Sequence, residues 1–275
     1  MRIDSHQHFW KYSAAEYPWI SNAMSRLRRD FLPVDLQNEL KKNRLDGSIV
    51  VQARQTIEET KWLLALSEQF PFIKGVVGWA DVRADNIEDQ LAELAEHPKF
   101  VGVRHVLQDE ADDRFMLRPD FMRGIEKLGR FGLTYDLLLF PRHLSNATKL
   151  VRKFPDQKFV LDHISKPSIK DGTLEPWTRE IKNFSKSPNV YCKLSGMVTE
   201  ARWTQWREAD FRPYVDVVFE AFGEDRLMFG SDWPVCLVSA SYQQVIGIVQ
   251  HYFSKRSAGM HAKIFGGNAV AFYGL

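Results

Sequence analysis

The chain has 275 residues, 44% of them hydrophobic, and its 37 basic and 35 acidic residues leave a net charge of +2. This length suits one α/β barrel or two smaller domains, and the even charge balance argues against nucleic acid or an anionic membrane as a partner. Two cysteines make no disulfide framework, and no secretory signal or bilayer-length apolar run is present, so we expect a soluble cytoplasmic protein.

Eight β-rich runs follow one another, each too far from the next for a hairpin. They cover residues 2–9, 47–53, 74–81, 100–107, 133–140, 158–164, 189–196 and 226–234. Helix-like stretches fill the gaps at 56–70, 85–98, 118–132, 145–155, 175–188, 209–223 and 239–253. This alternation predicts an α/β protein, a single-domain (β/α)8 TIM barrel over residues 1–275. A doubly wound open sheet is the second choice, because no glycine-rich phosphate turn is present.

Local signals mark several element ends. Thr56 has an acidic residue three positions later, and Asp85 has the same spacing, so we expect both to cap helices. Gly132 suits a left-handed helix end. Residues 10–32 and 197–209 are long loops after strands one and seven, and loops at the carboxyl ends of barrel strands commonly cover an active site.

Polar residues gather at the predicted carboxyl ends of the strands. His6 and His8 are two apart and so point to one side of a strand, with Asp4 below them. His163 shares a predicted face with Phe159 and Leu161. The other strand-end candidates are Gln52 or Arg54, Arg104 or His105, Tyr135 or Asp136, Lys166, Lys193 with Ser195, and Asp232. Burying a charged group at the end of an apolar strand costs free energy unless the group has a partner or a function. The ring of polar residues at the strand ends therefore predicts a catalytic face.

These residues resemble the amidohydrolase superfamily, and most closely its lactonase branch. The superfamily pattern of H-x-H on strand one, histidine on strand six and aspartate on strand eight is matched by His6, His8, His163 and Asp232. Further similarity lies in "DSHQHFW", "YPWI", "VVQAR", "GVRHVLQ", "VLDHISKP", "YCKLSG", "MFGSDWP" and "KIFGGNAVAFY", in order along the chain. The resemblance implies hydrolysis of a sugar-acid lactone, of the L-fuconolactone, L-rhamnonolactone or pyrone-dicarboxylate type.

A lactone hydrolase needs an activated water and a polarised carbonyl. We assign Asp232 as general base and the three histidines, His6, His8 and His163, as the polarising groups. They act directly or through one divalent ion. Zinc is the first candidate for this ion, and its expected ligands are His6, His8, Asp232 and His163. The expected substrate-binding residues are Arg104, Lys193, Arg54, Tyr135, Lys166 and Trp233, with Trp19, Trp203 and Trp206 as further aromatic walls.

Other readings remain open at this stage. Strands four and five lack the carboxylated lysine and histidine of two-metal relatives, so one ion or none is expected. A metal-dependent decarboxylase of the same superfamily is the alternative enzyme, and a catalytically silent sugar-acid binder is the third reading. A small-molecule lactone is the expected partner, with no nucleic acid or membrane, and a homodimer is the assembly that we consider.

Overall fold

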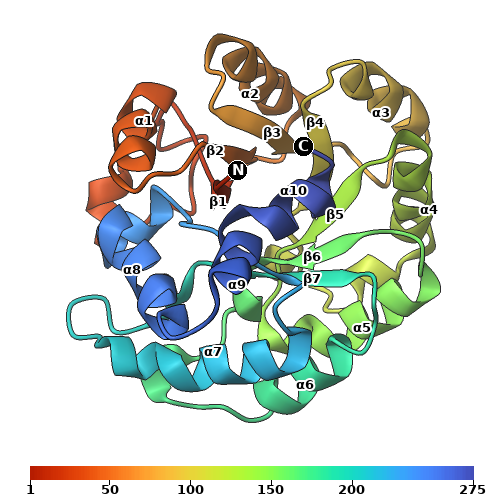
Figure 1. The fold of residues 1–275 in the computed structure, drawn as a ribbon. Coiled ribbons are helices and arrows are strands. Elements are labelled where there is room, and N and C mark those ends of the chain that lie inside the picture. Colours follow the sequence, from red (N-terminus) through yellow and green to blue (C-terminus); the bar gives the residue numbers. More distant parts are fainter.

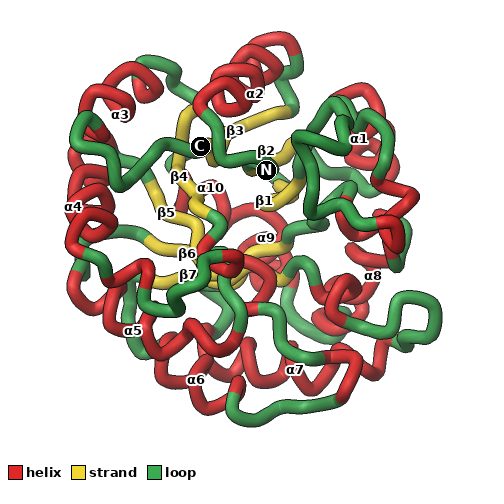
Figure 2. Tube along the Cα trace, turned by 180° about the vertical axis from the view of Figure 1, so that it is seen from behind, coloured by secondary structure: helices red, strands yellow, loops and turns green.

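A computed structural model describes all residues, 1–275, and contains one eight-stranded parallel sheet in the order β1 to β8. The strands are β1 Ile3–Gln7, β2 Gly47–Val51, β3 Ile73–Gly78, β4 Phe100–His105, β5 Thr134–Leu137, β6 Phe159–Leu161, β7 Val190–Leu194 and β8 Leu227–Phe229. The strands form a ring with the helices outside it (Figures 1 and 2). The predicted (β/α)8 barrel is confirmed, although every strand is shorter than its predicted run.

The helices are α1 Pro33–Lys42, α2 Ile57–Gln69, α3 Ile87–Ala95, α4 Pro119–Leu128, α5 Leu144–Lys153, α6 Trp177–Phe184, α7 Glu208–Phe222, α8 Tyr242–Phe253, α9 Ala258–Ala262 and α10 Asn268–Tyr273. The seven stretches expected to be helical correspond to α2 to α8, although α5 and α7 each begin one residue earlier than predicted. Helices α1, α9 and α10 were not among the predicted ranges.

The chain meets itself where β8 leads back to β1. The Asp232 amide donates to the His6 carbonyl at 2.8 Å, and the His8 amide donates to the Trp233 carbonyl at 2.7 Å. The Ser5 hydroxyl donates to the Phe229 carbonyl at 2.7 Å. These bonds join the end of β8 to β1, and they bring residues from opposite ends of the sequence side by side.

Two apolar cores support the ring. The larger core lies between strands and helices, and the smaller one fills the barrel with residues such as Ile49, Val77 and Val160. Phe272 and Tyr273 of α10 belong to this inner core. Figure 1 shows α10 in front of the strand ring, at the end where both termini lie. The C-terminal helix therefore closes the end of the barrel opposite to the carboxyl ends of the strands.

The local signals were partly correct. The Thr56 hydroxyl accepts from the Glu59 amide at 3.1 Å, so this cap is confirmed. Gly132 ends the α4 region with φ of +67°, as expected. The Asp85 cap is wrong: Asn86 precedes α3 without a side-chain cap, and Asp85 instead forms an ion pair with Arg123.

The two long segments are mainly loop, each with one short 3-10 turn, at Asn22–Leu27 and Met197–Glu200. An antiparallel β-bridge between Trp10 and Phe31 holds the two ends of the first segment together.

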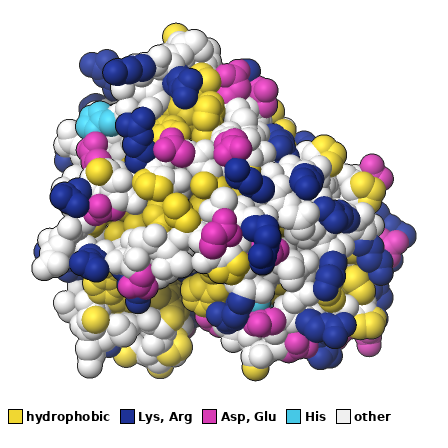
Figure 3. Space-filling view, turned by 90° about the horizontal axis from the view of Figure 1, so that it is seen from below, with side chains coloured by type: hydrophobic (Ala, Val, Ile, Leu, Met, Phe, Trp, Pro, Cys, Tyr) yellow, Lys and Arg dark blue, Asp and Glu magenta, His cyan; other side chains and the backbone are white.

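Basic and acidic side chains are interspersed over the face seen in Figure 3, consistent with the small net charge. None of the helices combines the length and apolar character that a membrane crossing requires.

Candidate active site

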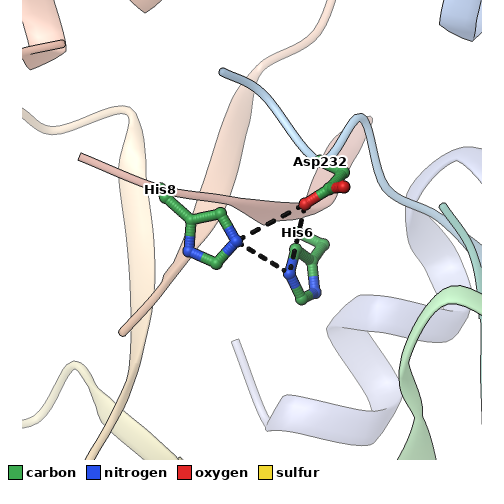
Figure 4. Close-up of side chains that lie close together, drawn as sticks. All are labelled: His6, His8 and Asp232. Atoms are coloured by element: carbon green, nitrogen blue, oxygen red, sulfur yellow. Dashed lines mark hydrogen bonds and ion pairs between the residues drawn. The ribbon is translucent and has the colours of Figure 1, made fainter. Parts of the chain in front are cut away.

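The two histidines of β1 and the aspartate after β8 converge at the carboxyl end of the barrel (Figure 4). Asp232 Oδ1 lies 3.5 Å from His8 Nε2 and 3.9 Å from His6 Nε2. The two Nε2 atoms are 3.2 Å apart. Asp232 has a left-handed backbone, with φ of +56°, which turns it away from a continuing strand. The predicted cluster is thus assembled by the backbone bonds that join β8 to β1.

His163 joins this cluster from the turn after β6. Its Nε2 atom lies 3.9 Å from Asp232 Oδ1, and its Nδ1 atom lies 2.9 Å from Ser195 Oγ on the neighbouring chain segment. His163 begins four consecutive residues with positive φ, an arrangement that L-residues adopt at a cost and that concentrates at functional sites. A Cβ at Gly196 would lie 2.6 Å from His163 Nδ1, so glycine there makes room for the ring.

Strand alternation does not explain the orientation of His163. Phe159 and Leu161 pack in the outer core, whereas Val160 faces the barrel interior. The expectation that His163 shares a face with Phe159 and Leu161 is therefore wrong, because β6 ends at Leu161 and the left-handed turn redirects the next residues. Asp4 also departs from expectation: it binds Ser231 and Tyr242, since the β1 register shifts between Asp4 and Gln7.

The donor set fits a divalent cation. His8 Nδ1 lies 2.7 Å from the Val51 carbonyl, which can only accept, so Nδ1 carries the proton and Nε2 presents a lone pair. That lone pair points toward His6 Nε2 and the Asp232 carboxylate. Imidazole nitrogens with a carboxylate oxygen are ligands that zinc prefers. The candidate holders of such an ion are His6, His8, Asp232 and His163.

Burial and charge set the protonation of the cluster. Burial alone would raise the pKa of Asp232, but the imidazoles, His163 foremost, hold that pKa below its usual range. Burial lowers the pKa of His163 to about 4, and it moves the pKa of His6 well below its usual value. At neutral pH the Asp232 carboxyl is consequently ionised and the His6 and His163 imidazoles are neutral, the forms that a base and metal ligands require.

A layer of buried charges lies beneath the cluster, and only Arg104 of this layer reaches the cavity. Lys193 Nζ lies 2.5 Å from Asp136 Oδ2 and 3.0 Å from Asp162 Oδ1. Arg104 Nη1 lies 3.0 Å from Asp162 Oδ2 and 3.4 Å from His6 Nε2. The positive charges of Lys193 and Arg104 balance the negative charges of Asp136 and Asp162. The negative charge of Asp232 is therefore not neutralised by this layer.

Above the cluster is a cavity of about 510 Å³. His8, His163, Asp232 and Arg104 line its floor, and Trp19 of the first long loop is part of its wall. Arg54 and Lys166, both predicted to bind substrate, also line the cavity. Additional polar lining comes from Glu16, Gln55, Gln108, Asp109, Thr199 and Glu200. Most of the lining residues are polar, so the cavity offers hydrogen-bonding groups to a polyhydroxylated ligand alongside apolar wall surface.

Three predicted substrate-binding residues do not line this cavity. The Tyr135 side chain is buried, and its ring packs 6.0 Å from that of Phe121 on α4. Trp233 is buried with its ring 5.3 Å from Phe31, under the first long loop. Lys193 has no exposed surface and lies below the histidines. Strand or turn backbone directs each of these side chains away from the cavity, so the structure does not bring these three predicted residues to its wall.

Other side chains are also placed by the structure. Arg104 faces the cavity, whereas His105 stacks on Phe115 and bonds Glu110 Oε1 at 2.6 Å, which answers a question left open by the sequence. Trp203 and Trp206 line a separate surface groove. The cysteines Cys192 and Cys236 are buried and free.

Sequence reasoning missed two acidic residues. Asp162, which directly precedes His163, was not among the candidates, yet it pairs with Arg104 beneath the cavity. Its position between a buried strand and a histidine was a usable signal. Glu200 lines the cavity from the second long loop, where no periodicity indicates direction. Burial, opposed by the Lys166 charge, raises the pKa of Glu200.

Comparison with known proteins shows similarity along the entire chain. The Amidohydrolase family model matches residues 3–275. The L-fucono-1,5-lactonase of Burkholderia multivorans is 42% identical over 286 residues, covering 100% of this chain and 96% of the relative. The L-fucono-1,5-lactonase of Burkholderia ambifaria is 36% identical over 279 residues, covering 99% and 95%. A crystal structure of a Burkholderia multivorans amidohydrolase with bound zinc superimposes with a TM-score of 0.96 at 42% identity, covering 100% of this chain and 99% of that one.

Proposed function

The chain belongs to the amidohydrolase family, and from that premise we propose that it opens a sugar-acid lactone of the L-fucono-1,5-lactone type by hydrolysis. The resemblance to the lactonase branch is confirmed by relatives that match across the whole chain. An L-rhamnonolactone-type substrate is the nearest alternative within the same reaction.

One observation carries the proposal beyond the similarity. Three imidazole Nε2 atoms face a single carboxylate oxygen, that of Asp232, within 3.9 Å, at the floor of a cavity lined mainly by polar residues. This arrangement places a base and electrophilic groups where the carbonyl of a bound lactone can reach both. An uncharged polyol ring also suits the mixture of hydrogen-bonding walls and the Trp19 indole.

In the proposed mechanism, Asp232 accepts a proton from a water molecule as the water oxygen attacks the lactone carbonyl. The tetrahedral oxyanion forms beside Arg104, whose fixed guanidinium stabilises the developing charge. The bond between the carbonyl carbon and the ring oxygen then breaks, and Asp232 returns its proton to that oxygen. The product is an open-chain hydroxy acid, which ionises at neutral pH.

A divalent ion, when bound by His6, His8, Asp232 and His163, supplies polarisation of the carbonyl and a lower pKa for the attacking water. Zinc is the proposed ion, supported by the donor set and by the zinc in the similar crystal structure. Such help matters because a carboxylate with a lowered pKa, as Asp232 has, is a weak base on its own.

Two cationic side chains at the cavity wall are proposed to bind substrate hydroxyl groups. Arg54 is presented on a turn whose backbone is held by Glu59: the Arg54 amide donates to Glu59 Oε2 at 2.7 Å. The Arg54 guanidinium also pairs with Glu16 of the first long loop. Lys166, from the turn that carries His163, lines the cavity as well.

The test is an acid-release assay with a pH indicator on a panel of sugar-acid lactones. Rapid hydrolysis of L-fucono-1,5-lactone, slowed by a chelator and restored by zinc, supports the proposal. The same preparations are tested for carbon dioxide release from hydroxybenzoic acids. Decarboxylation without lactone hydrolysis would replace the proposed function by the decarboxylase alternative.

We also propose that the protein works in the cytoplasm on a free small-molecule substrate, without nucleic acid, and as a homodimer. The two buried free cysteines are compatible with a reducing compartment. Light scattering of the purified protein tests the assembly.

A further inference from the structure

The buried charge layer connects the active site to the C-terminal helix. We propose that Lys193 is a positioning residue that fixes the His6 ring, and that Tyr273 of α10 holds Lys193 in place through Asp136. The inference rests on the proposed role of His6 at a cation site and adds a support that reaches the opposite end of the barrel.

The contacts of Lys193 define the first step. Its ammonium group lies 3.1 Å from His6 Nδ1, 3.0 Å from Asp162 Oδ1 and 2.5 Å from Asp136 Oδ2. The two carboxylate oxygens accept from the ammonium group, whereas His6 Nδ1 carries the ring proton when Nε2 binds a cation, and it then donates to Asp162 Oδ1 at 3.3 Å. Lys193 therefore acts on the His6 ring through the Asp162 carboxylate that it holds. Because the side chain has no exposed surface and does not line the cavity, it cannot act by touching substrate.

His6 is the histidine that depends on this layer. His8 is oriented by the Val51 carbonyl, and His163 by the Ser195 hydroxyl, both uncharged partners. The His6 Nδ1 atom has Asp162 at 3.3 Å in addition to Lys193. Partners on the far nitrogen of a ligating histidine set its ring orientation and tune its affinity for metal.

Tyr273 supplies the second step. Its hydroxyl lies 3.2 and 3.1 Å from the two oxygens of Asp136, the carboxylate that holds Lys193. Tyr273 stands at the end of α10, which packs into the inner core with Phe272. The last helix is thus joined to His6 by an unbroken sequence of buried polar contacts, Tyr273 to Asp136 to Lys193 to Asp162.

Stability alone does not account for the arrangement. Buried ion pairs give little or no net stability relative to apolar residues, because desolvation offsets their attraction. The inner barrel nearby is filled by residues such as Ile49 and Val77, so an apolar layer is the simpler way to pack it. The contact with His6 provides a reason for burying charge at this level.

The test measures zinc affinity by competition with a chromophoric chelator, together with kcat and KM. Lys193→Met, which keeps the length of the side chain, should weaken zinc binding by roughly 10–100-fold and reduce kcat. Tyr273→Phe, one step further out, should weaken it by a smaller factor, about 3–10-fold. Tyr214→Phe is the control, since that buried hydroxyl bonds the Ser168 and Thr173 carbonyls at 3.2 Å, away from the charge layer. It should leave zinc affinity within about twofold.

Circular dichroism establishes that each variant is folded, and Tyr273→Phe decides the matter if Lys193→Met does not fold. Wild-type zinc affinity in a folded Tyr273→Phe protein would overturn the proposal. So would a Lys193→Met protein whose KM rises while zinc affinity stays unchanged, because that result would make Lys193 a substrate contact. The zinc measurement needs no lactone, so its failure is distinct from failure of the proposed hydrolysis.

Discussion

Replacing Asp232 by asparagine removes the proposed base with almost no change in shape. Asp232 Oδ1 is the carboxylate oxygen within 4.0 Å of the Nε2 atoms of His6, His8 and His163, and no other carboxylate approaches those atoms as closely. Asp162 is close to His6, but it lies at the opposite ring nitrogen, Nδ1. No other acid therefore lies within 4.0 Å of these nitrogens, where the missing base stood.

The expected loss follows from that isolation. General base catalysis contributes on the order of 10²–10⁴ in rate, which corresponds to about 3–5 kcal/mol in the barrier. Asp232→Asn should lower kcat for lactone hydrolysis by the whole of this factor at saturating zinc. The assay is initial-rate acid release, after subtraction of spontaneous hydrolysis, with thermal unfolding to confirm that the fold is intact.

Asp113→Asn is the matched control for this prediction. Asp113 also lies beside a histidine, with Oδ1 2.9 Å from His143 Nε2, but the pair is outside the cavity. The kcat of the Asp113→Asn protein should remain within about twofold of the wild-type value, because Asp113 does not touch the reacting atoms. A folded Asp232→Asn enzyme that retains more than a tenth of wild-type kcat would refute the assignment of the base.

Other consequences can be measured with the same protein. Trp19→Ala should raise KM about fivefold and leave kcat nearly unchanged, because an aromatic wall contributes about 1 kcal/mol to binding a sugar ring; a fall in kcat alone would contradict this role. Zinc-free protein should lose stability as pH falls from 6.5 toward 4, since the unfolded chain takes up a proton on His163 at its usual pKa of 6.5 whereas the folded chain does so at about 4. This difference corresponds to about 3 kcal/mol in the free energy of unfolding. Urea titrations at the two pH values measure it, and the His163→Gln protein should lack it. An equal pH dependence of stability in both proteins would show that other groups are responsible. Prolonged dialysis against a strong chelator should abolish lactone hydrolysis and lower the unfolding temperature, and zinc should restore both; full activity of protein shown by elemental analysis to be metal-free would contradict the role of zinc.

The barrel and its central cluster were accessible from the sequence for a physical reason. Buried parallel strands are short apolar runs, and the crossovers between them need room for a helix, so eight such units imply the ring. Closure of the ring then requires His6 and Asp232 to meet, although 225 positions separate them in the chain. The order of elements alone is sufficient for that inference.

Side-chain direction was accessible only where a strand continues. Alternation of inward and outward side chains holds within a strand, but it stops at the last residue of the ladder. Beyond β6, the left-handed turn brings both Asp162 and His163 toward the site, which alternation forbids. The Lys193 side chain points into the barrel, as alternation predicts. The sequence does not indicate, however, that its ammonium group lies beneath His6 and does not reach the cavity.

The C-terminal helices were missed because they do not belong to the repeating unit. Helix α10 is only six residues long, and its apolar face packs against the inner core at the closed end of the barrel. Residues such as Phe272 and Tyr273 carry a signal for burial but none for the partner that buries them. The contact between Tyr273 and Asp136 joins distant segments and emerges only in three dimensions.

Anomalous diffraction at the zinc absorption edge, from crystals of enzyme loaded with one equivalent of zinc, addresses the central claim most directly. A single peak is predicted at the carboxyl end of the barrel, within coordination distance of His6 Nε2, His8 Nε2 and an oxygen of Asp232. A fully occupied peak elsewhere in the molecule, with this cluster unchanged and lactone hydrolysis undiminished, would contradict the account.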